Sequence, residues 1–157
     1  MNTKQQYTQK VISGGQTGVD RAALDVAMKL GFATGGWCPA GRKAVDGRIP
    51  DHYNLTETKS KNYRVRTGWN IRDSDATMVL YTGNLEGGTA LTIKLAKDKN
   101  KPWIALDLKH EVNQNEALNW LRAVQPTTLN IAGPREESRP GIHRQADIFL
   151  TDVLKKT

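Results

Sequence analysis

The sequence predicts an α/β domain in which a mainly parallel sheet of about five strands lies between helices. Two observations lead to this fold class. Short apolar runs of strand length alternate along the chain with longer segments whose apolar residues recur at helical spacing. Glycine-rich turns follow several of these runs, where a strand passes into a helix. Strands that alternate with helices pair in parallel through right-handed crossovers, so the expected architecture is a three-layer, Rossmann-like domain.

The expected strands are short and mostly apolar. The first covers 10–13 and ends at two glycines, and the run 76–81 is almost continuously apolar, as in strands buried on both faces of a parallel sheet. Further extended segments are expected at 33–38, 102–106 and 128–132.

The clearest helix begins beyond Gly18 and ends at Gly31, with apolar residues at helical spacing between them. Other helices are expected at 62–73, 89–97, 115–124 and 140–156. The turn-rich stretch 39–51 contains two prolines, two glycines and three basic residues, and we expect a functional loop there.

Composition narrows the classes of protein to consider. A length of 157 residues suits one domain, expected to span 1–157. No stretch approaches the roughly 20 apolar residues of a membrane helix, so a cytoplasmic protein without membrane contact is expected. Cys38 has no second cysteine to pair with, and without a CxxC or HxxxH pair no structural metal is expected. The net charge of +7 favours acidic partners, and the basic residues beside glycine-rich segments favour a compact anion site.

The strongest motif joins the first strand to the first helix over 13–21. Glycines let backbone amides approach a phosphate, and the helix N-terminus adds unpaired N–H groups. A turn needed only for chain reversal is the alternative. The segment lacks the Gly-Lys-Ser/Thr of a P-loop and the GxGxxG dinucleotide fingerprint. The candidate ligand contacts in this loop are Gly14, Gly15, Gln16, Thr17 and Gly18.

Two charged residues follow directly in the first turn of that helix. Asp20 is a candidate for ligand contact and equally for stabilising the helix N-terminus. Arg21 is a candidate for a bidentate phosphate contact, with an ion pair to Asp25 as the alternative.

A second glycine cluster lies between the strand at 76–81 and its helix. Gly87, Gly88 and Thr89 are candidate anion contacts there, although Thr89 also suits an ordinary N-cap. The carboxyl ends of neighbouring parallel strands share one edge of the sheet, so this cluster and the first should face one crevice.

Two further loops supply cations. A cluster at 132–138 contributes Arg135, and the loop at 37–50 contributes Arg42 as a wall of the pocket. Cys38 in that loop is either a reactive thiol or soft metal ligand, or a small buried side chain. His143, near the last glycine cluster, is the one histidine to test.

The stretch 59–72 interleaves basic residues with Tyr63 and Trp69. That pattern suits binding of single-stranded nucleic acid, and it equally suits a solvated helix face with the aromatic rings packed inward. We rank nucleic acid as an unlikely partner, below a small ligand.

Four segments, 12–21, 36–42, 87–89 and 132–136, together resemble the family known as the putative molybdenum carrier proteins, and the resemblance spans nearly the whole chain. That family is similar in fold to molybdenum-cofactor carriers and to lysine-decarboxylase-like phosphoribohydrolases. The resemblance implies a nucleotide-like or molybdopterin-like ligand as cargo, with molybdenum cofactor or a nucleotide as the cofactor concerned, and a homo-oligomer.

The phosphoribohydrolases carry a PGGxGTxxE pattern whose glutamate serves catalysis. When Gly88 and Thr89 are aligned on its Gly-Thr, Thr92 stands in place of that glutamate. The first interpretation is therefore a carrier, the second a nucleotide-processing hydrolase that uses another carboxylate, and the third a nucleic-acid binder.

Overall fold

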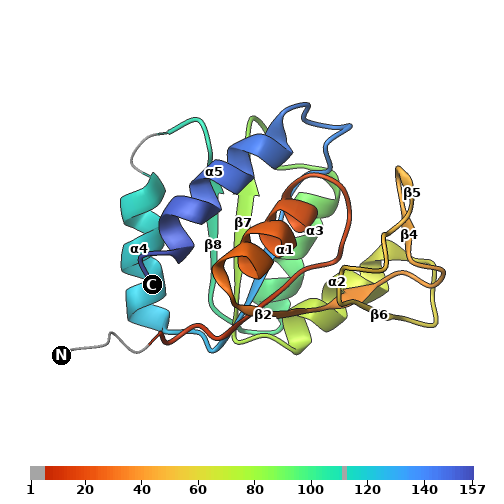
Figure 1. Cartoon of the computed structure of the whole chain (residues 1–157), viewed down its shortest axis with the longest axis horizontal. Coiled ribbons are helices and arrows are strands. Elements are labelled where there is room, and N and C mark those ends of the chain that lie inside the picture. Colours follow the sequence, from red (N-terminus) through yellow and green to blue (C-terminus); the bar gives the residue numbers. More distant parts are fainter. Residues whose placement is uncertain (1–5, 111–112) are drawn as a thin grey trace.

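The computed structural model describes residues 6–110 and 113–157, and its centre is a sheet of five parallel strands (Figure 1). The strands lie in the order β2, β1, β9, β7, β8. Their bounds are Lys10–Ile12 (β1), Ala33–Gly35 (β2), Ala76–Tyr81 (β7), Trp103–Asp107 (β8) and Thr128–Ala132 (β9). Because every pairing is parallel, all carboxyl ends lie at one edge. The predicted α/β, Rossmann-like fold class is confirmed.

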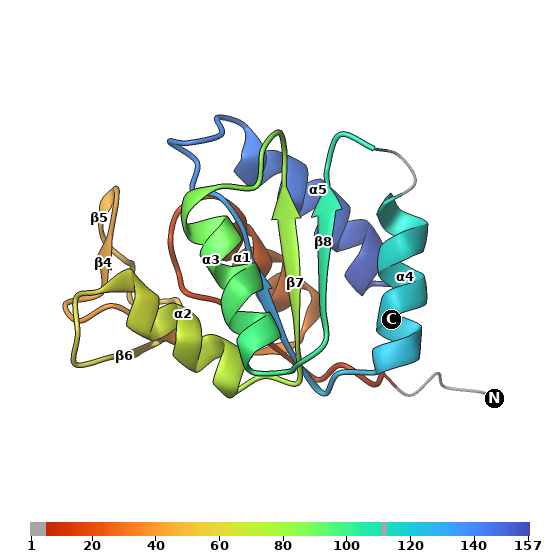
Figure 2. The same ribbon diagram turned by 180° about the vertical axis from the view of Figure 1, so that it is seen from behind.

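Helices lie on both faces of this sheet. On one face, α1 (Val19–Leu30), α4 (Asn113–Val124) and α5 (Ile142–Leu154) share an apolar core with the strands. On the other, α3 (Gly87–Asp98) packs against β7 and β8, and α2 (Tyr63–Arg72) packs beside α3, as the view from behind shows (Figure 2). The sheet therefore forms the middle of three layers.

The connections diverge at the centre of the sheet. From β1 the chain passes through α1 to the edge strand β2, whereas from β7 it passes through α3 to β8 at the opposite edge. β9, the last strand in sequence, lies between β1 and β7. In open α/β sheets a ligand crevice forms beyond the carboxyl ends at such a switch point. The loops after β1, β7 and β9 meet there.

The predicted elements agree with the structure to within two residues at each end, with one difference. The extended segment expected at 33–38 divides at Gly36 into β2 and the short strand β3 (Trp37–Cys38). Gly36 has φ +130°, and a Cβ there would lie 2.1 Å from the carbonyl oxygen of Ser13. This turn takes the chain out of the main sheet, so β3 pairs with β6 (Thr56–Glu57) instead.

The segment 39–55 forms a small unit against the outer side of α1. Its hairpin consists of β4 (Lys43–Ala44) and β5 (Gly47–Arg48). Cys38 is fully buried in its apolar core beside Leu24, and this burial raises the pKa of the thiol. Cys38 therefore acts in packing rather than as a reactive thiol. None of the described helices is long and apolar enough to cross a membrane.

Candidate ligand-binding site

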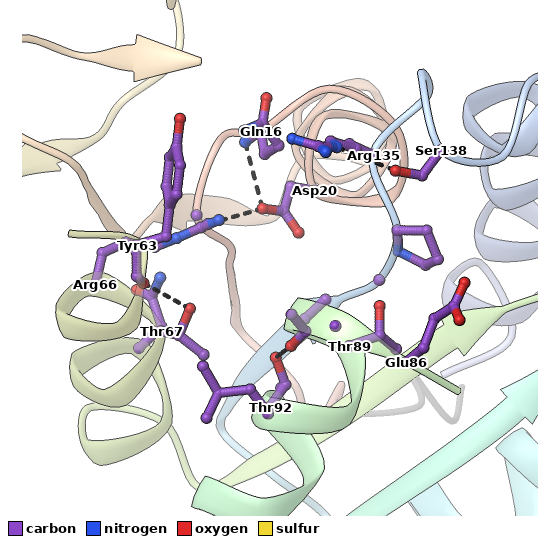
Figure 3. A pocket seen from close by; sticks show the side chains of 18 of the residues that line it. Gln16, Asp20, Tyr63, Arg66, Thr67, Glu86, Thr89, Thr92, Arg135 and Ser138 are labelled. Atoms are coloured by element: carbon purple, nitrogen blue, oxygen red, sulfur yellow. Dashed lines mark hydrogen bonds and ion pairs between the residues drawn. The ribbon is translucent and has the colours of Figure 1, made fainter. Parts of the chain in front are cut away.

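A cavity of about 600 Å³ lies beyond the carboxyl ends of β1, β7 and β9. The loops that follow these strands line it, together with one side of α2 and the start of α3 (Figure 3). Small-molecule sites in proteins have volumes of about 300–1,000 Å³. Both its size and its place at the switch point make this cavity the candidate site.

The loop between β1 and α1 turns its backbone donors back onto the protein. The amide of Gln16 donates to the Asp20 carboxylate at 3.3 Å, and the amide of Thr17 donates to the Gln16 side chain at 3.0 Å. The amide of Val19 donates to a carbonyl of the β9–α5 loop at 3.2 Å. These three donors are therefore already used, although part of the loop lines the cavity.

An ion pair between α1 and α2 forms one wall. Arg66 Nη1 donates to Asp20 Oδ2 at 2.9 Å, and the two side chains are only 13% and 5% exposed. A Cβ on Gly14 would lie 1.4 Å from Arg66 Nη1, so this position must be glycine for the guanidinium to cross the loop. Burial raises the pKa of the Asp20 carboxyl, and Arg66 opposes that rise. Arg66 Nε is buried without a hydrogen-bond partner among the described residues.

The start of α3 presents its backbone openly. The helix begins at Gly87 after Glu86, whose side chain makes no capping hydrogen bond. The first N–H groups of a helix have no intrahelical partner, and Gly87 and Gly88 are both exposed. A Cβ on Gly88 would meet no atom within 4 Å. Thr89 is buried in the first turn of the helix, so its interpretation as the N-cap is wrong.

Thr92 lies one turn further along α3 on the same wall. Its hydroxyl donates to the Gly88 carbonyl at 2.9 Å. At this position the phosphoribohydrolase pattern has a glutamate. Thr92 provides no carboxylate there, and its hydroxyl is used in a hydrogen bond within α3.

Two arginines of the loop between β9 and α5 complete the cavity. Arg139 donates to the Thr82 carbonyl at 3.0 Å and pairs with Glu86 at 3.0 Å, so it ties this loop to the β7–α3 loop. Arg135 is exposed and donates through Nε to the Ser138 hydroxyl at 3.0 Å. Three arginines and two acids line the cavity, which leaves one positive charge in excess. These residues are Arg66, Arg135, Arg139, Asp20 and Glu86.

Arg21 points to a second, smaller cavity of about 360 Å³. Both of its terminal nitrogens donate to Asp46, at 2.8 Å for Nη2, and its Nε donates to the Gly15 carbonyl at 3.1 Å. The alternative interpretation of Arg21, an ion pair with Asp25, is wrong. Asp25 instead accepts a hydrogen bond from Tyr53 at 2.7 Å and lies 3.0 Å from His143 Nε2.

Arg42 lies inside the 39–55 unit. Its Nη2 donates to the carbonyls of Pro50 at 2.7 Å and Tyr53 at 2.9 Å, and its Nε donates to the Ile49 carbonyl at 3.0 Å. The structure does not bring Arg42 to the lining of either cavity. The loop is folded around this guanidinium, which satisfies carbonyls that would otherwise be buried without a partner.

The structure thus divides the residues proposed from sequence into three groups. The larger cavity is lined by Gly14, Gln16, Asp20, Gly87, Gly88, Thr89 and Arg135. The smaller cavity is lined by Thr17, Gly18 and Arg21. Gly15 packs beneath Leu55, and Arg42 is internal to its own loop.

Sequence reasoning missed the contribution of α2. Tyr63, Arg66 and Asn70 line the cavity, and their spacing of three and four residues places them on one helix face. That spacing was the signal available in the sequence. The other aromatic residue of the same stretch packs elsewhere, because Trp69 contacts Trp37 edge to face at 4.8 Å between ring centroids.

Side chains suited to metals do not gather in the part of the chain that the structure describes. No three His, Cys, Asp or Glu side chains lie close enough together there to hold an ion. The cavity instead offers backbone amides, arginines and side-chain amides, which suit an anionic organic ligand or an oxyanion.

The fold and this site define a Rossmann-like α/β protein with a polar cavity at the switch point of its sheet. The chain belongs to the circularly permutated YpsA SLOG family, whose model matches residues 11–154. It is also similar to a crystal structure described as a putative molybdenum carrier protein from Syntrophus aciditrophicus. The two chains are 41% identical with a TM-score of 0.89, over 94% of this chain and 95% of that one. No match is found among the curated proteins. The resemblance inferred from sequence is confirmed.

Proposed function

We propose that this protein binds a small molecule through a phosphate or another oxyanionic group, and that the anion contacts the N-terminus of α3. The observation that carries this proposal is the open start of that helix, where Gly87 and Gly88 adjoin a 600 Å³ cavity. Free N–H groups and the positive end of the helix dipole favour an anion. The excess positive charge around the cavity acts in the same direction.

Gly88 supports the proposal separately. A side chain there would meet no atom of the protein within 4 Å, and its φ is not in the left-handed region, so packing and backbone geometry do not require glycine. A ligand that approaches the backbone closely does require it.

We favour a carrier function, in which the protein binds such a ligand without converting it. The solved relative is described as a putative molybdenum carrier protein. Molybdate, the phosphate group of molybdenum cofactor and a nucleotide phosphate all present the tetrahedral oxyanion that this helix start suits. Thr92 supports binding without turnover, because it leaves the wall of α3 without a carboxylate.

Hydrolysis is the second candidate, and Asp20 is the observation that favours it. Two acidic residues line the cavity. The Asp20 side chain is buried, whereas the Glu86 side chain is 67% exposed. Incubation with nucleoside monophosphates tests this candidate. A carrier releases no free base, and release that Asp20→Asn abolishes would establish the hydrolase.

Gly88→Ala tests the binding proposal. We expect the affinity for inorganic phosphate, molybdate and AMP, measured by calorimetry, to fall about tenfold or more, because the added methyl group occupies the space of the anion. The helix itself should gain up to about 1 kcal/mol from the better propensity of alanine.

Gly68→Ala is the matched control. Gly68 lies within α2, a Cβ there also meets nothing within 4 Å, and the residue does not line the cavity. This variant should gain stability with no change in affinity. Equal affinities in Gly88→Ala and the unsubstituted protein would contradict an anion site at α3.

A further inference from the structure

The Asp20 carboxylate is the one acidic group that the cavity keeps away from solvent. Its side chain is 5% exposed, and it lines the cavity from the first turn of α1. Taking a carboxylate out of water is unfavourable unless each oxygen finds a donor. The hydrogen-bond donors around each oxygen therefore indicate which ligand group the Asp20 carboxylate can bind.

The two oxygens differ in their surroundings. Oδ2 accepts from Arg66 Nη1 at 2.9 Å and from the Gln16 amide at 3.3 Å. Figure 3 shows both interactions reaching the same oxygen, while the other oxygen, Oδ1, points into the cavity. The hydrogen bonds among the described residues give Oδ1 no partner. An unpaired oxygen of a largely buried carboxylate thus faces the space that the ligand would occupy.

The chemistry of this acceptor excludes some occupants. A second anionic group beside Asp20 would be repelled. An ammonium group would gain little, because the Arg66 guanidinium already neutralises this carboxylate and would repel another cation. A neutral hydroxyl group donates one hydrogen bond without adding charge. It is the donor that best fits Oδ1.

The size of the cavity points the same way. A water molecule, with one heavy atom, takes up about 30 Å³ of liquid. An oxyanion has only five heavy atoms, so it would fill a small part of the 600 Å³ cavity. The tyrosine ring of Tyr63 and the side-chain amides of Asn70 and Asn130 line the remaining space. The Asn70 amide is bound on both sides to the backbone of Trp37, so the Tyr63 ring is the surface among these that an organic body would contact.

We propose that Asp20 is a specificity-determining residue that accepts a hydrogen bond from a ligand hydroxyl, so that the site selects a phosphorylated polyol, such as a ribose phosphate, over a bare oxyanion. This inference rests on the proposed anion site at α3. The ligand lies with its phosphate at α3 and its hydroxyl groups toward α1. The glycine-rich loop after β1 then serves the hydroxyl end of the ligand and not its phosphate.

Calorimetry with three probes tests this arrangement in the unsubstituted protein. Ribose 5-phosphate should bind at least about tenfold more tightly than methyl phosphate or inorganic phosphate, since only the sugar carries hydroxyl groups remote from its phosphate that can reach the unpaired oxygen of Asp20. Equal affinity for the three probes would overturn the inference while leaving the anion site intact. Binding of none of them would overturn the proposed function itself.

Asp20→Asn then assigns the selectivity to this residue. The ratio of affinities for ribose 5-phosphate and inorganic phosphate should fall to within about threefold, while inorganic phosphate itself binds about two- to threefold more tightly because a negative charge is gone. An unchanged ratio in the folded variant would overturn the inference. If the variant does not fold, the comparison of probes in the unsubstituted protein decides alone.

Asp46→Asn is the matched control, since Asp46 is also paired with an arginine but lines the other cavity. It should keep the full selectivity ratio. A loss of selectivity equal to that of Asp20→Asn would mean that any carboxylate near α1 has this effect, and would overturn the assignment to Asp20.

Discussion

Two glycine-rich loops at the same edge of the sheet differ in what surrounds their glycines. In the loop after β1, residues 13–18, the glycines let the protein pack against itself. A Cβ on Gly14 would collide with Arg66, and one on Gly18 would lie 2.3 Å from the Pro134 carbonyl oxygen. At the start of α3, a Cβ on Gly88 would meet nothing. A glycine-rich motif therefore indicates close approach to a backbone without saying whether protein or ligand approaches.

The hydrogen bonds of the two loops differ in the same way. Donors of the first loop are bound to side chains and carbonyls of the protein, and the loop is buried from residue 13 to residue 20. Residues 83–88 of the second loop are exposed. Mutations in the first loop should consequently change stability more than binding, and mutations in the second loop should do the reverse.

Gly18→Ala should have the largest effect. Gly18 has φ +83° and ψ −130°, a conformation open to glycine, and its Cβ would overlap the Pro134 carbonyl. The strain and overlap together should lower the free energy of unfolding by about 2–4 kcal/mol. Urea denaturation measures this. A loss below about 0.5 kcal/mol would show that the first loop tolerates change as surface loops do.

Arg42→Ala should have a slightly smaller effect, of about 2–3 kcal/mol on the free energy of unfolding, because it leaves several loop carbonyls without their donor. Ile49 and Leu55 of the same unit pack beneath Gly15, so the substitution loosens the first loop from outside. The affinity of the folded variant for phosphate should not change. A weakened affinity with stability intact would restore Arg42 as a ligand contact.

Arg139→Ala should act on the second loop. It removes the bonds to Thr82 and Glu86 that hold the β7–α3 loop in place, together with one positive charge. We expect affinity for inorganic phosphate to fall about tenfold, with less than about 1 kcal/mol lost in stability. Calorimetry and urea denaturation of the same samples separate the two effects. Arg139→Lys retains the charge and should recover only part of the affinity, since lysine lacks the planar fork.

Asp46→Asn should have the smallest effect. The Arg21 guanidinium lowers the pKa of the Asp46 carboxyl below its usual 3.8, so the pair stabilises the fold above that value and the contribution is lost as pH falls through the lowered pKa. Asp46 is 45% exposed, so the variant should lose no more than about 1 kcal/mol at pH 7. The difference between variant and unsubstituted protein should shrink in denaturation curves as the pH falls through the lowered pKa of Asp46. A difference that persists in acid would show that the pair does not act through charge.

The sequence alone determined the alternation of strands and helices and the placing of two glycine loops at one edge. Except at 33–38, which divides at Gly36, apolar periodicity gave helix and strand positions to within two residues, because local hydrogen bonding and burial of one face act over neighbouring residues. Parallel pairing followed from the alternation, and it put the loop containing Gly14 and the loop containing Gly87 on one cavity.

Only the tertiary structure decided which cations reach that cavity. Arg21, Arg42 and Arg66 all carry the same fork of donors, and sequence reasoning chose the first two because they adjoin glycines. A guanidinium stands several bonds from its backbone, so its position depends on what packs around it. The carbonyls of the 39–55 unit hold Arg42, Asp46 holds Arg21, and Arg66 reaches Asp20 across 46 residues of sequence because α2 packs beside the first loop.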